Sequence, residues 1–588
     1  MRHDPAAAAR ALTFCCAVFT AANAQADKVP FTRIVSLTGD PVISGGTMTS
    51  MTFPAMNDNG RVGFLTTIDN APGGPGTDRR MYVNDGGFFS REVVREGEAV
   101  PSGDGLFADF STPILNNAGQ VLFHSTLSGT TGGADDNAGV YLSMVAESVS
   151  DPTQVARKGA SAPDGNGVFA SFKSLSLNET GHSVFEGTLA NTVAGGADDA
   201  GIYLAGPEGL TQIARKGQAV PGGNGVFAEF GTPRLNDAGQ ISFVAELAQT
   251  TNSVQDDTAL YLYDPQSGLT QLLREGQSYA SGAWIGDINN GTTNGFNNAG
   301  EVVFPHSLVT ASNNWAMLRV GPNGAITELF REGEPSPDGN GTINYGTSAR
   351  VLNEAGQTTT TVFINNSTRG SSDNTGVLLA DGANDPVMLL REGQPALDGN
   401  GEFATFYSSI VNNAGQAVIA GQLRGTEESF LDNELIYFHD PALGMHKVAR
   451  EGDDLYGALV RTVNSGSNGG INDAGAVAYR FWLYDGRYGI AVWQLVDRIP
   501  GDTDADFDID DIDLGTIFGN YTGPLTPGTG GMTPADGDTD GDGDIDDTDL
   551  GTAFSAYTGP FDAAAVPEPT SLAAIVLAGT VLMRRRRA

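Results

Sequence analysis

The chain has 588 residues, 40% of them apolar, which is enough for a buried core in at least one domain. Its formal net charge of −38 argues against general nucleic-acid binding, because such a protein repels the phosphate backbone. Seventy-nine glycines and only 17% charged residues are typical of an all-β protein with many tight turns.

The N-terminal segment has the order of a signal peptide. Basic residues precede an apolar stretch at 11–22, and the Ala-Asn-Ala motif at 22–24 supplies the small residues that a signal peptidase needs. Residues 1–24 are therefore predicted to direct export and to be removed. A lipoprotein signal at Cys15 is the weaker alternative. The mature chain is predicted to lack cysteine and disulfides, since Cys15 and Cys16 are the two cysteines of the sequence.

Residues 30–497 repeat one pattern eight times, with a period of about sixty residues. Each copy begins with Asn-x-x-Gly, and an aromatic residue follows the glycine by four positions in most copies. The first residues of the pattern are Asn57, Asn116, Asn178, Asn236, Asn297, Asn353, Asn412 and Asn472. The residues four positions after the glycine are Phe64, Phe123, Phe185, Phe243, Phe304, Thr360, Ile419 and Tyr479, so the sixth and seventh copies depart from the pattern.

Two features of each copy have a predicted structural role. Because asparagine and glycine both tolerate positive φ, Asn-x-x-Gly is expected to form the tight turn between the first and second strands. A later Arg-Glu/Lys-Gly landmark is interpreted as an inter-repeat hydrogen bond or salt bridge, with ligand binding as the less favoured alternative. The arginines concerned are Arg95, Arg157, Arg215, Arg274, Arg331, Arg391 and Arg450.

The fourth copy illustrates the expected strands. Short alternating runs at 227–235, 241–247, 259–263 and 269–273 predict four strands per copy. Eight such units predict an all-β fold, an eight-bladed β-propeller followed by a small α calcium-loop module. An open solenoid is the alternative, because periodicity alone does not show closure.

The two ends of the repeat region favour a closed ring. The last copy leaves no room for a fourth strand before the aspartate-rich segment begins. Residues 31–37 resemble the fourth-strand segment 210–214 and precede the first Asn-x-x-Gly, so they are expected to complete the last blade. The eight copies resemble the tandem-repeat family of exported proteins named for the NxxGxxxF motif and for varied C-terminal anchors. This resemblance implies surface attachment and carries no assigned activity.

Two twelve-residue loops, thirty-six residues apart, carry aspartates at positions 1, 3, 5, 9 and 12. Calcium takes six to eight oxygen ligands, and this spacing wraps alternate carboxylates around one ion, with a backbone carbonyl at position 7. Without a cation, so many neighbouring negative charges would be strongly unfavourable. The predicted Ca²⁺ ligands are Asp502, Asp504, Asp506, Asp508, Asp510 and Asp513 in the first loop and Asp538, Asp540, Asp542, Asp544, Asp546 and Asp549 in the second.

Each loop is expected to lead into one amphipathic helix. Leu514, Ile517, Phe518 and Tyr521 have helical spacing, and the second loop is followed by the same arrangement. One helix per loop, with Asp at position 12, resembles a type I dockerin over residues 501–560. The resemblance implies docking to a cohesin-like protein; a calcium-stiffened spacer is the equal alternative. The first loop departs from the pattern, because Phe507 occupies position 6 in place of glycine.

The C-terminal tail at 566–588 has Pro-Glu-Pro, then an apolar run at 572–583, then four arginines. This order resembles the PEP-CTERM sorting signal that an exosortase-type enzyme processes. The run is short for a permanent transmembrane helix, so at least transient membrane attachment is expected, with a plain tail anchor as the alternative. The predicted location is the cell surface or extracellular matrix.

Function follows less directly from the sequence. A non-catalytic binding or structural module is the favoured interpretation, with an extracellular polysaccharide, matrix component or protein as partner. The alternative is a polysaccharide-degrading enzyme, a glycoside hydrolase or lyase, with an appended dockerin. The sequence contains no nucleophile elbow and no His-Glu-x-x-His motif, although paired glycosidase carboxylates would leave no motif. The irregular segment 281–294, with Trp284, is the predicted ligand contact.

Overall fold

The computed structural model describes residues 28–558 except 75, 88–89, 147, 280–282, 289–294, 310–314, 348–350, 467–469, 505–508 and 524–530. The predicted signal peptide at 1–24 and sorting tail at 566–588 lie outside the described residues. The chain divides into two compact units. One is Thr32–Gln494, and the other includes the residues from Leu495 onward.

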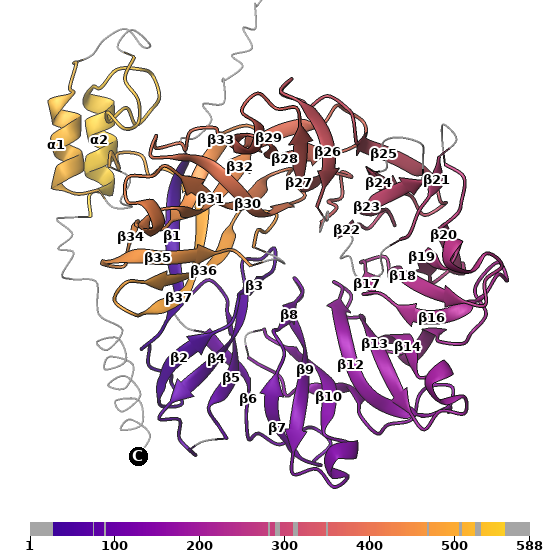
Figure 1. Ribbon diagram of the computed structural model, residues 1–588. Coiled ribbons are helices and arrows are strands. Elements are labelled where there is room, and N and C mark those ends of the chain that lie inside the picture. The colour runs from indigo at the N-terminus through magenta and orange to yellow at the C-terminus, as the bar shows by residue number, and fades with distance from the viewer. Residues whose placement is uncertain are drawn as a thin grey trace, which may run out of the picture. The chain divides into compact units, whose positions relative to one another are not determined.

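The unit Thr32–Gln494 is an eight-bladed β-propeller, which confirms the predicted fold class (Figure 1). Each blade is an antiparallel sheet, and the colour in Figure 1 passes from blade to blade around the ring in chain order. The strand that runs into Asn-x-x-Gly is often split in two, because it bends before the turn.

The first four blades follow one another without interruption. Blade 1 contains β2 (Thr47–Met51), β3 (Ala55–Met56), β4 (Val62–Asp69), β5 (Arg79–Asn84) and β6 (Ser90–Arg95). Blade 2 contains β7 (Leu106–Phe110), β8 (Ile114–Leu115), β9 (Gln120–Ser128), β10 (Ala138–Met144) and β11 (Thr153–Arg157). Blade 3 contains β12 (Val168–Leu177), β13 (Ser183–Ala190), β14 (Ala200–Gly206) and β15 (Gly209–Arg215). Blade 4 contains β16 (Val226–Phe230), β17 (Arg234–Leu235), β18 (Ile241–Ala248), β19 (Thr258–Asp264) and β20 (Gly268–Arg274).

The next three blades repeat this plan. Blade 5 contains β21 (Trp284–Ile285), β22 (Gly295–Phe296), β23 (Val302–Val309), β24 (Trp315–Val320) and β25 (Ile326–Arg331). Blade 6 contains β26 (Thr342–Gly346), β27 (Thr358–Asn365), β28 (Thr375–Ala380) and β29 (Val387–Arg391). Blade 7 contains β30 (Glu402–Val411), β31 (Ala417–Arg424), β32 (Glu434–Asp440) and β33 (Gly444–Arg450).

Blade 8 is built from both ends of the repeat region. Its strands are β34 (Asp454–Leu455), β35 (Ala458–Asn464), β36 (Val477–Leu483), β37 (Tyr488–Asp497) and β1 (Lys28–Leu37), in the order β1-β37-β36-β35-β34. The expected closure by the N-terminal strand is therefore confirmed, and the open solenoid is excluded. β37 has β1 on its outer side, so its backbone is not left as a free edge.

The core lies between adjacent blades. In the first four copies, the aromatic residue of the repeat packs with side chains of the preceding blade and stacks on a tyrosine of the neighbouring strand. Phe123 stacks on Tyr141 with ring centroids 5.8 Å apart, and Phe185 stacks on Tyr203 at the same distance. These four rings are fully buried, and burying one such side chain contributes about 1.5 to 3 kcal/mol. Thr360 and Ile419 occupy the same buried position in the two divergent copies.

The asparagine of Asn-x-x-Gly does more than the predicted turn. The eight glycines have φ between +74° and +88°, but none of the eight asparagines has positive φ, so the expectation for asparagine is wrong. Each asparagine is buried, and its side-chain Oδ1 accepts a hydrogen bond from the backbone N–H four residues later. The side-chain Nδ2 donates to the backbone carbonyl oxygen of the next copy's asparagine, closing a ring: Asn57 to Asn116 (2.8 Å), Asn116 to Asn178 (2.9 Å), Asn178 to Asn236 (3.0 Å), Asn236 to Asn297 (3.0 Å), Asn297 to Asn353 (3.2 Å), Asn353 to Asn412 (2.8 Å), Asn412 to Asn472 (2.8 Å) and Asn472 to Asn57 (3.4 Å).

The residue after each asparagine forms a second ring. Its side-chain oxygen accepts a hydrogen bond from the backbone N–H of the equivalent residue in the preceding copy, and Asp473 closes the ring by donating to Asp58 at 3.0 Å. Burial raises the pKa of Glu179 and of Glu354, and nearby carboxylates, Asp237 among them, add to the shift. The members are Asp58, Asn117, Glu179, Asp237, Asn298, Glu354, Asn413 and Asp473.

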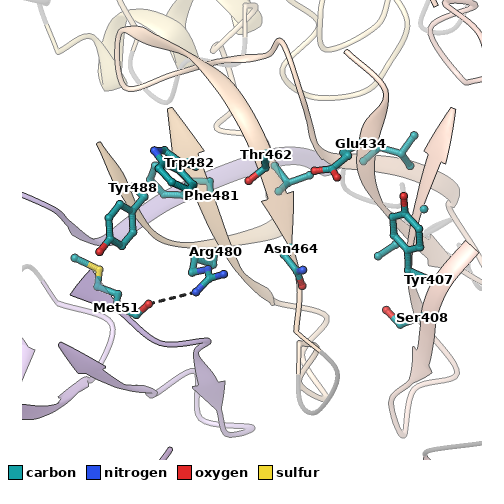
Figure 2. A pocket seen from close by; sticks show the side chains of 14 residues that line it. Met51, Tyr407, Ser408, Glu434, Thr462, Asn464, Arg480, Phe481, Trp482 and Tyr488 are labelled. Carbon is teal, nitrogen blue, oxygen red and sulfur yellow. Dashed lines mark hydrogen bonds between the residues drawn. The ribbon is translucent and has the colours of Figure 1, made fainter. Parts of the chain in front are cut away.

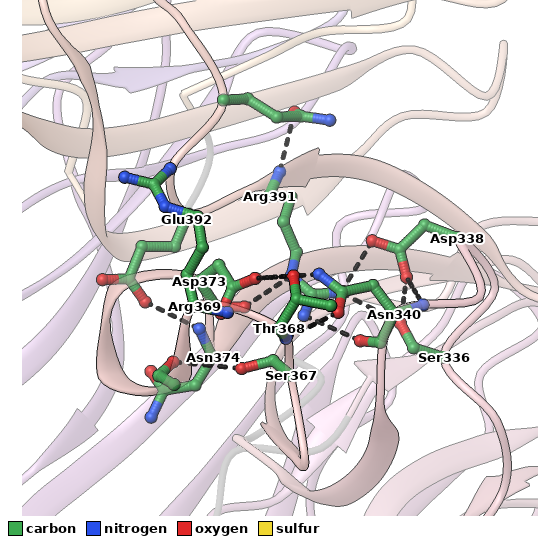
Figure 3. Close-up of polar contacts among 12 residues, drawn as sticks. Ser336, Asp338, Asn340, Ser367, Thr368, Arg369, Asp373, Asn374, Arg391 and Glu392 are labelled. Atoms are coloured by element: carbon green, nitrogen blue, oxygen red, sulfur yellow. Dashed lines mark hydrogen bonds and ion pairs between the residues drawn. The ribbon is translucent and has the colours of Figure 1, made fainter.

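The recurring arginine fastens the loop that enters its blade (Figure 3). The Nε atom of Arg391 donates to the carbonyl oxygen of Asp373 at 2.7 Å, and its Nη1 lies 2.6 Å from a carboxylate oxygen of Asp338. Its Nη2 donates to the carbonyl oxygen of Asn340 at 2.9 Å. Asp338 and Asn340 belong to the connection between blades 5 and 6, so one guanidinium ties this connection to the strand that ends blade 6.

Four further copies repeat the contact between Nε and a carbonyl oxygen of the same blade. Arg157, Arg215, Arg274 and Arg450 are buried and donate from Nε to the carbonyl oxygens of Asp136, Asp198, Asp256 and Asp432 at 2.6 to 2.9 Å. Arg95 and Arg331 depart from the scheme. The side chain of Arg95 is 48% exposed, and Arg331 pairs with Glu328 on its own strand.

Candidate functional site

The second aspartate-rich loop brings together the carboxylates of positions 1, 3 and 5. The side-chain oxygens of Asp538, Asp540 and Asp542 include a set within 4.8 Å of one another. Gly543, at position 6, has a φ of +87°, the left-handed conformation that favours glycine at this sharp turn. Backbone N–H groups of Gly541 and Gly543 donate to Asp538 at 2.7 and 2.9 Å and draw the loop around its carboxylate.

The aspartates at positions 9 and 12 of each loop also form the beginning of the following helix. α2 (Asp547–Ala556) is capped by Asp546, whose carboxylate accepts from the backbone N–H of Thr548, while Asp549 accepts from the backbone N–H of Asp546 at 2.8 Å. This reciprocal pair is a capping box. The side chains of Asp544, Asp546 and Asp549 form another set of oxygens within 4.8 Å of one another. Asp544, at position 7, is predicted to contribute its backbone carbonyl, and its side chain also belongs to this set.

The first loop is built in the same way. Asp502, Asp504 and Asp513 place side-chain oxygens within 4.8 Å of one another. Asp510 caps α1 (Asp511–Gly519), and Asp513 accepts from the backbone N–H of Asp510 at 2.9 Å. The other predicted ligands of this loop, Asp506 and Asp508, lie outside the described residues, as does Phe507 at position 6.

Five of the loop aspartates are buried to an unusual degree. Asp502 and Asp513 are fully buried, and Asp538, Asp544 and Asp549 are at most 3% exposed. Burial and the charge of Asp542 raise the pKa of Asp540, followed by smaller contributions from other ligand carboxylates. Buried carboxylates of this kind are stabilised by metal coordination or by ion pairs. The oxygen-only donor set fits a hard cation such as Ca²⁺.

The two loop-helix units are related by internal symmetry. The hydroxyl of Tyr521, which follows α1, donates to Asp547 at 2.8 Å, and that of Tyr557, which follows α2, donates to Asp511 at 2.6 Å. Ile509 and Ile545, at position 8 of their loops, are buried with Ile517 and Ala553 in one small core. Each unit thus braces the beginning of the other unit's helix.

The helices differ from the predicted amphipathic pattern, because part of the predicted apolar face is exposed. Phe518 and Phe554 were expected to share the buried face with Ile517, but they are 54% and 53% exposed. Their rings contact each other edge to face with centroids 5.8 Å apart. Ile512, near the beginning of α1, is also 61% exposed. The helix pair therefore presents apolar side chains to solvent.

The propeller has a hollow of about 460 Å³ whose lining comes from blades 7, 8 and 1 (Figure 2). In Figure 2, Trp482 and Tyr488 lie on one side of Arg480, and Glu434 and Tyr407 lie on the other. Burial raises the pKa of Glu434, and a hydrogen bond from the backbone N–H of Val463 offsets this only in part. Burial and the negative charge of Glu434 raise the pKa of the Tyr407 hydroxyl, so the two groups act on each other electrostatically.

Sequence reasoning did not identify this hollow. A comparison of the repeats offers a signal, because the residue after the aromatic position is Ala420 in blade 7 and Arg480 in blade 8, where blades 1 and 4 have Leu65 and Val244. The predicted contact Trp284 is 52% exposed in β21, in agreement with the expected exposure, but much of its segment lies outside the described residues. No structural evidence tests its role in binding.

Within the described part of the chain, no helix is long and apolar enough to cross a membrane. The segment expected to do so, at 572–583, lies outside that part.

Several solved propellers resemble the chain at low identity. The β-propeller domain of the Trilobed protease from Pyrococcus furiosus is 11% identical with a TM-score of 0.33, and the match covers 66% of this chain and 95% of that one. Pyrococcus horikoshii acylaminoacyl peptidase is 9% identical with a TM-score of 0.33, covering 74% of this chain and 57% of the peptidase. Trypanosoma rangeli sialidase is 10% identical with a TM-score of 0.28, covering 80% and 95%. Scores this low carry no argument about activity.

No curated protein matches the chain. One family model does, over residues 34–308 and 288–500, which together span the whole propeller. The chain therefore belongs to the family described as a family of unknown function, DUF7453.

Proposed function

We propose that this is an exported cell-surface or matrix protein whose propeller is a non-catalytic binding module and whose residues 501–560 form a calcium-stabilised, dockerin-like docking module. The signal-peptide pattern at 1–24 and the sorting pattern at 566–588 support export and exosortase-type processing. Both segments act before or during attachment, so the mature protein consists of the propeller and the helix pair.

The burial of the loop aspartates is the observation that carries the proposal. Five carboxylates are at most 3% exposed, in two loops of identical spacing. Buried negative charges destabilise the folded state unless a nearby positive charge compensates them. Bound Ca²⁺ supplies that charge and accepts carboxylate and carbonyl oxygens as ligands. The chain's own contribution is the geometry: the loops wrap the carboxylates together, and the capping boxes orient Asp513 and Asp549.

The exposed side chains of the helix pair favour docking over a spacer. Ile512, Phe518 and Phe554 are each more than half exposed, whereas a spacer would gain nothing from apolar surface in water. A cohesin-like protein is the proposed partner. Replacing Phe518 and Phe554 with serine is expected to weaken such docking without changing calcium binding, because neither side chain is a ligand.

A binding role for the propeller is favoured over glycoside hydrolysis. Hydrolysis by the usual mechanism needs two carboxylates on either side of the scissile bond. The described lining of the 460 Å³ hollow contains one carboxylate, Glu434. The acidic members of the second ring each accept a hydrogen bond from a backbone N–H of the neighbouring copy, which gives them a structural role.

Calcium titration of the mature chain by calorimetry tests the proposal. We expect two saturable binding events for the wild type and one for Asp549→Asn, which removes a position-12 ligand. Asp511→Asn is the matched control, since it makes the same charge change on the symmetry-related helix at a residue that binds Tyr557. No saturable binding up to millimolar calcium, or equal loss in both variants, would contradict the proposed metal sites.

A further inference from the structure

A second hollow shares part of its lining with the 460 Å³ hollow. It measures about 410 Å³ and is lined by residues of blades 1, 2 and 8, and both hollows have Met51 and Arg480 in their lining. This hydrogen-bonded pair therefore lies between the two hollows. The two hollows, with Met51 and Arg480 between them, are named here the blade 7–1 groove.

Blade 7 has a small side chain where other blades have larger ones, and this opens space for the groove. Ala420 occupies the position at which blade 3 has Glu186 and blade 8 has Arg480. The irregular register of β30 between Phe406 and Ser408 turns Tyr407 outward, and its side chain is 54% exposed. A small residue on one strand and a bulged tyrosine on the next thus open the space between blades 7 and 8.

The walls of the groove carry exposed aromatic rings. Trp482 is 43% exposed and contacts Tyr488 with ring centroids 5.8 Å apart. The guanidinium of Arg461 lies 5.0 Å from the centre of the Trp482 ring and supports it from one side. Tyr407 lies across the hollow from Trp482 (Figure 2). Rings that present a flat apolar face in a polar groove suit the C–H faces of sugar rings.

Arg480 lies between the two hollows, and its guanidinium donates one hydrogen bond to the described residues. Its guanidinium lies 4.1 Å from the centre of the Phe53 ring, and its Nη1 donates to the carbonyl oxygen of Met51 at 3.4 Å. Among the described residues, no carboxylate lies within ion-pair distance of it. An arginine without a carboxylate partner is unusual in a chain with a net charge of −38. Its guanidinium fork matches the geometry of a carboxylate and can therefore pair with one on a ligand.

We propose that the blade 7–1 groove binds a linear acidic polysaccharide, with the aromatic walls stacking on sugar rings and Arg480 pairing with a uronate carboxylate. This inference deepens the proposed function, since it names the ligand class of the propeller. Thr462, Asn464 and Ser408 line the same hollow and supply donors and acceptors for hydroxyl groups. Glu434 accepts hydrogen bonds from sugar hydroxyl groups at the end of the groove away from Arg480.

The test is calorimetric titration of the calcium-loaded mature chain with oligogalacturonate and with a neutral cello-oligosaccharide of the same length. We expect saturable binding of the uronate and at least tenfold weaker binding of the neutral sugar. Arg480→Gln is expected to weaken uronate binding at least tenfold and to remove the preference for the acid. Trp482→Ala is expected to weaken binding of the uronate by a similar factor.

Two matched controls separate the groove from general effects. Arg95→Gln removes an exposed arginine outside the groove, and Tyr345→Ala removes an aromatic ring on blade 6 that is 43% exposed; both are expected to bind uronate as the wild type does. Circular dichroism and the urea midpoint establish that each variant is folded. Equal affinity for both sugars, or full affinity in a folded Arg480→Gln variant, overturns the inference. If neither sugar binds while calcium still binds at two sites, the groove assignment fails and the calcium module stands.

Discussion

The side-chain amide of Asn472 donates a hydrogen bond to the backbone carbonyl oxygen of Asn57, 415 residues away, at 3.4 Å. Bonds between consecutive copies in this ring measure 2.8 to 3.2 Å. The longest bond therefore lies where the first and last copies meet. The ring of asparagines closes between blades 8 and 1, and the pairing of β1 with β37 closes the propeller within blade 8.

Replacing one asparagine of the first ring should destabilise the propeller. Asn353 is buried, donates to the carbonyl oxygen of Asn412 at 2.8 Å and accepts from the backbone N–H of Gln357 at 2.7 Å. Asn353→Ala removes both hydrogen bonds and leaves the backbone N–H of Gln357 without its acceptor, whereas the carbonyl oxygen of Asn412 keeps the N–H of Gly415. We therefore expect a loss of about 2 kcal/mol in the free energy of unfolding. Urea unfolding at constant calcium measures it. The control is Asn117→Ala, at a more accessible position in the second ring; an equal loss in both variants would contradict this account.

Replacing a buried arginine that contacts the entering loop should lower the free energy of unfolding by more than Asn353→Ala does. Arg391 is 3% exposed and binds three groups of the entering loop and of its own blade, so Arg391→Met leaves Asp338 and two carbonyl oxygens without their donor. We expect a loss of about 3 kcal/mol. Arg95→Met, at the exposed copy of the same landmark, should change stability by less than about 0.5 kcal/mol. Similar unfolding midpoints for the two variants would show that the contact contributes little.

Deletion of β1 should open the ring. A chain that begins at residue 38 leaves β37 as an unpaired edge and removes Val35 from the core that includes Ile490 and Val492. We expect association through the exposed edge, seen by light scattering after size-exclusion chromatography, together with a lower unfolding midpoint. A chain that begins at residue 28 is the control and should stay monodisperse. A monodisperse, equally stable deletion variant would mean that closure does not depend on this strand.

Acid should weaken the loop contacts through the buried aspartates. Burial opposes ionisation of Asp373, but hydrogen bonds from Ser367 and Asn340 outweigh it and hold the pKa of Asp373 below its ordinary value. The unfolded chain takes up the proton first, so the stabilisation is complete above the ordinary pKa of about 4 and is lost as pH falls through the lower folded value. The advantage of the wild type over Asp373→Asn in urea unfolding, with calcium chelated, should shrink as the pH falls below the ordinary aspartate pKa of about 4. An advantage that does not change with pH would exclude this linkage.

Much of the fold could be predicted because it depends on local patterns. Alternating runs in each copy produce strands, the glycines of Asn-x-x-Gly supply the positive φ of the turn, and the segment at 31–37 has the character of a missing fourth strand. The aspartate spacing likewise brings Asp538, Asp540 and Asp542 together, because their positions lie on one short loop. The same reasoning misplaced Phe518, since helical spacing identifies a face but not whether another element covers it.

The sequence by itself determined the number of blades and the two clustered aspartate loops, because each of these depends on residues near one another in the chain. It also indicated the strand that closes the ring, because the last copy lacks a fourth strand and residues 31–37 resemble one. Only the tertiary structure decided the inter-copy hydrogen bonds of the asparagines, the loops that the arginines hold and the blade 7–1 groove. Met51 and Arg480 meet although 429 residues separate them, and a contact between distant copies leaves no periodic trace in the sequence. Those features depend on which side chains adjacent blades place opposite each other, and packing alone sets that.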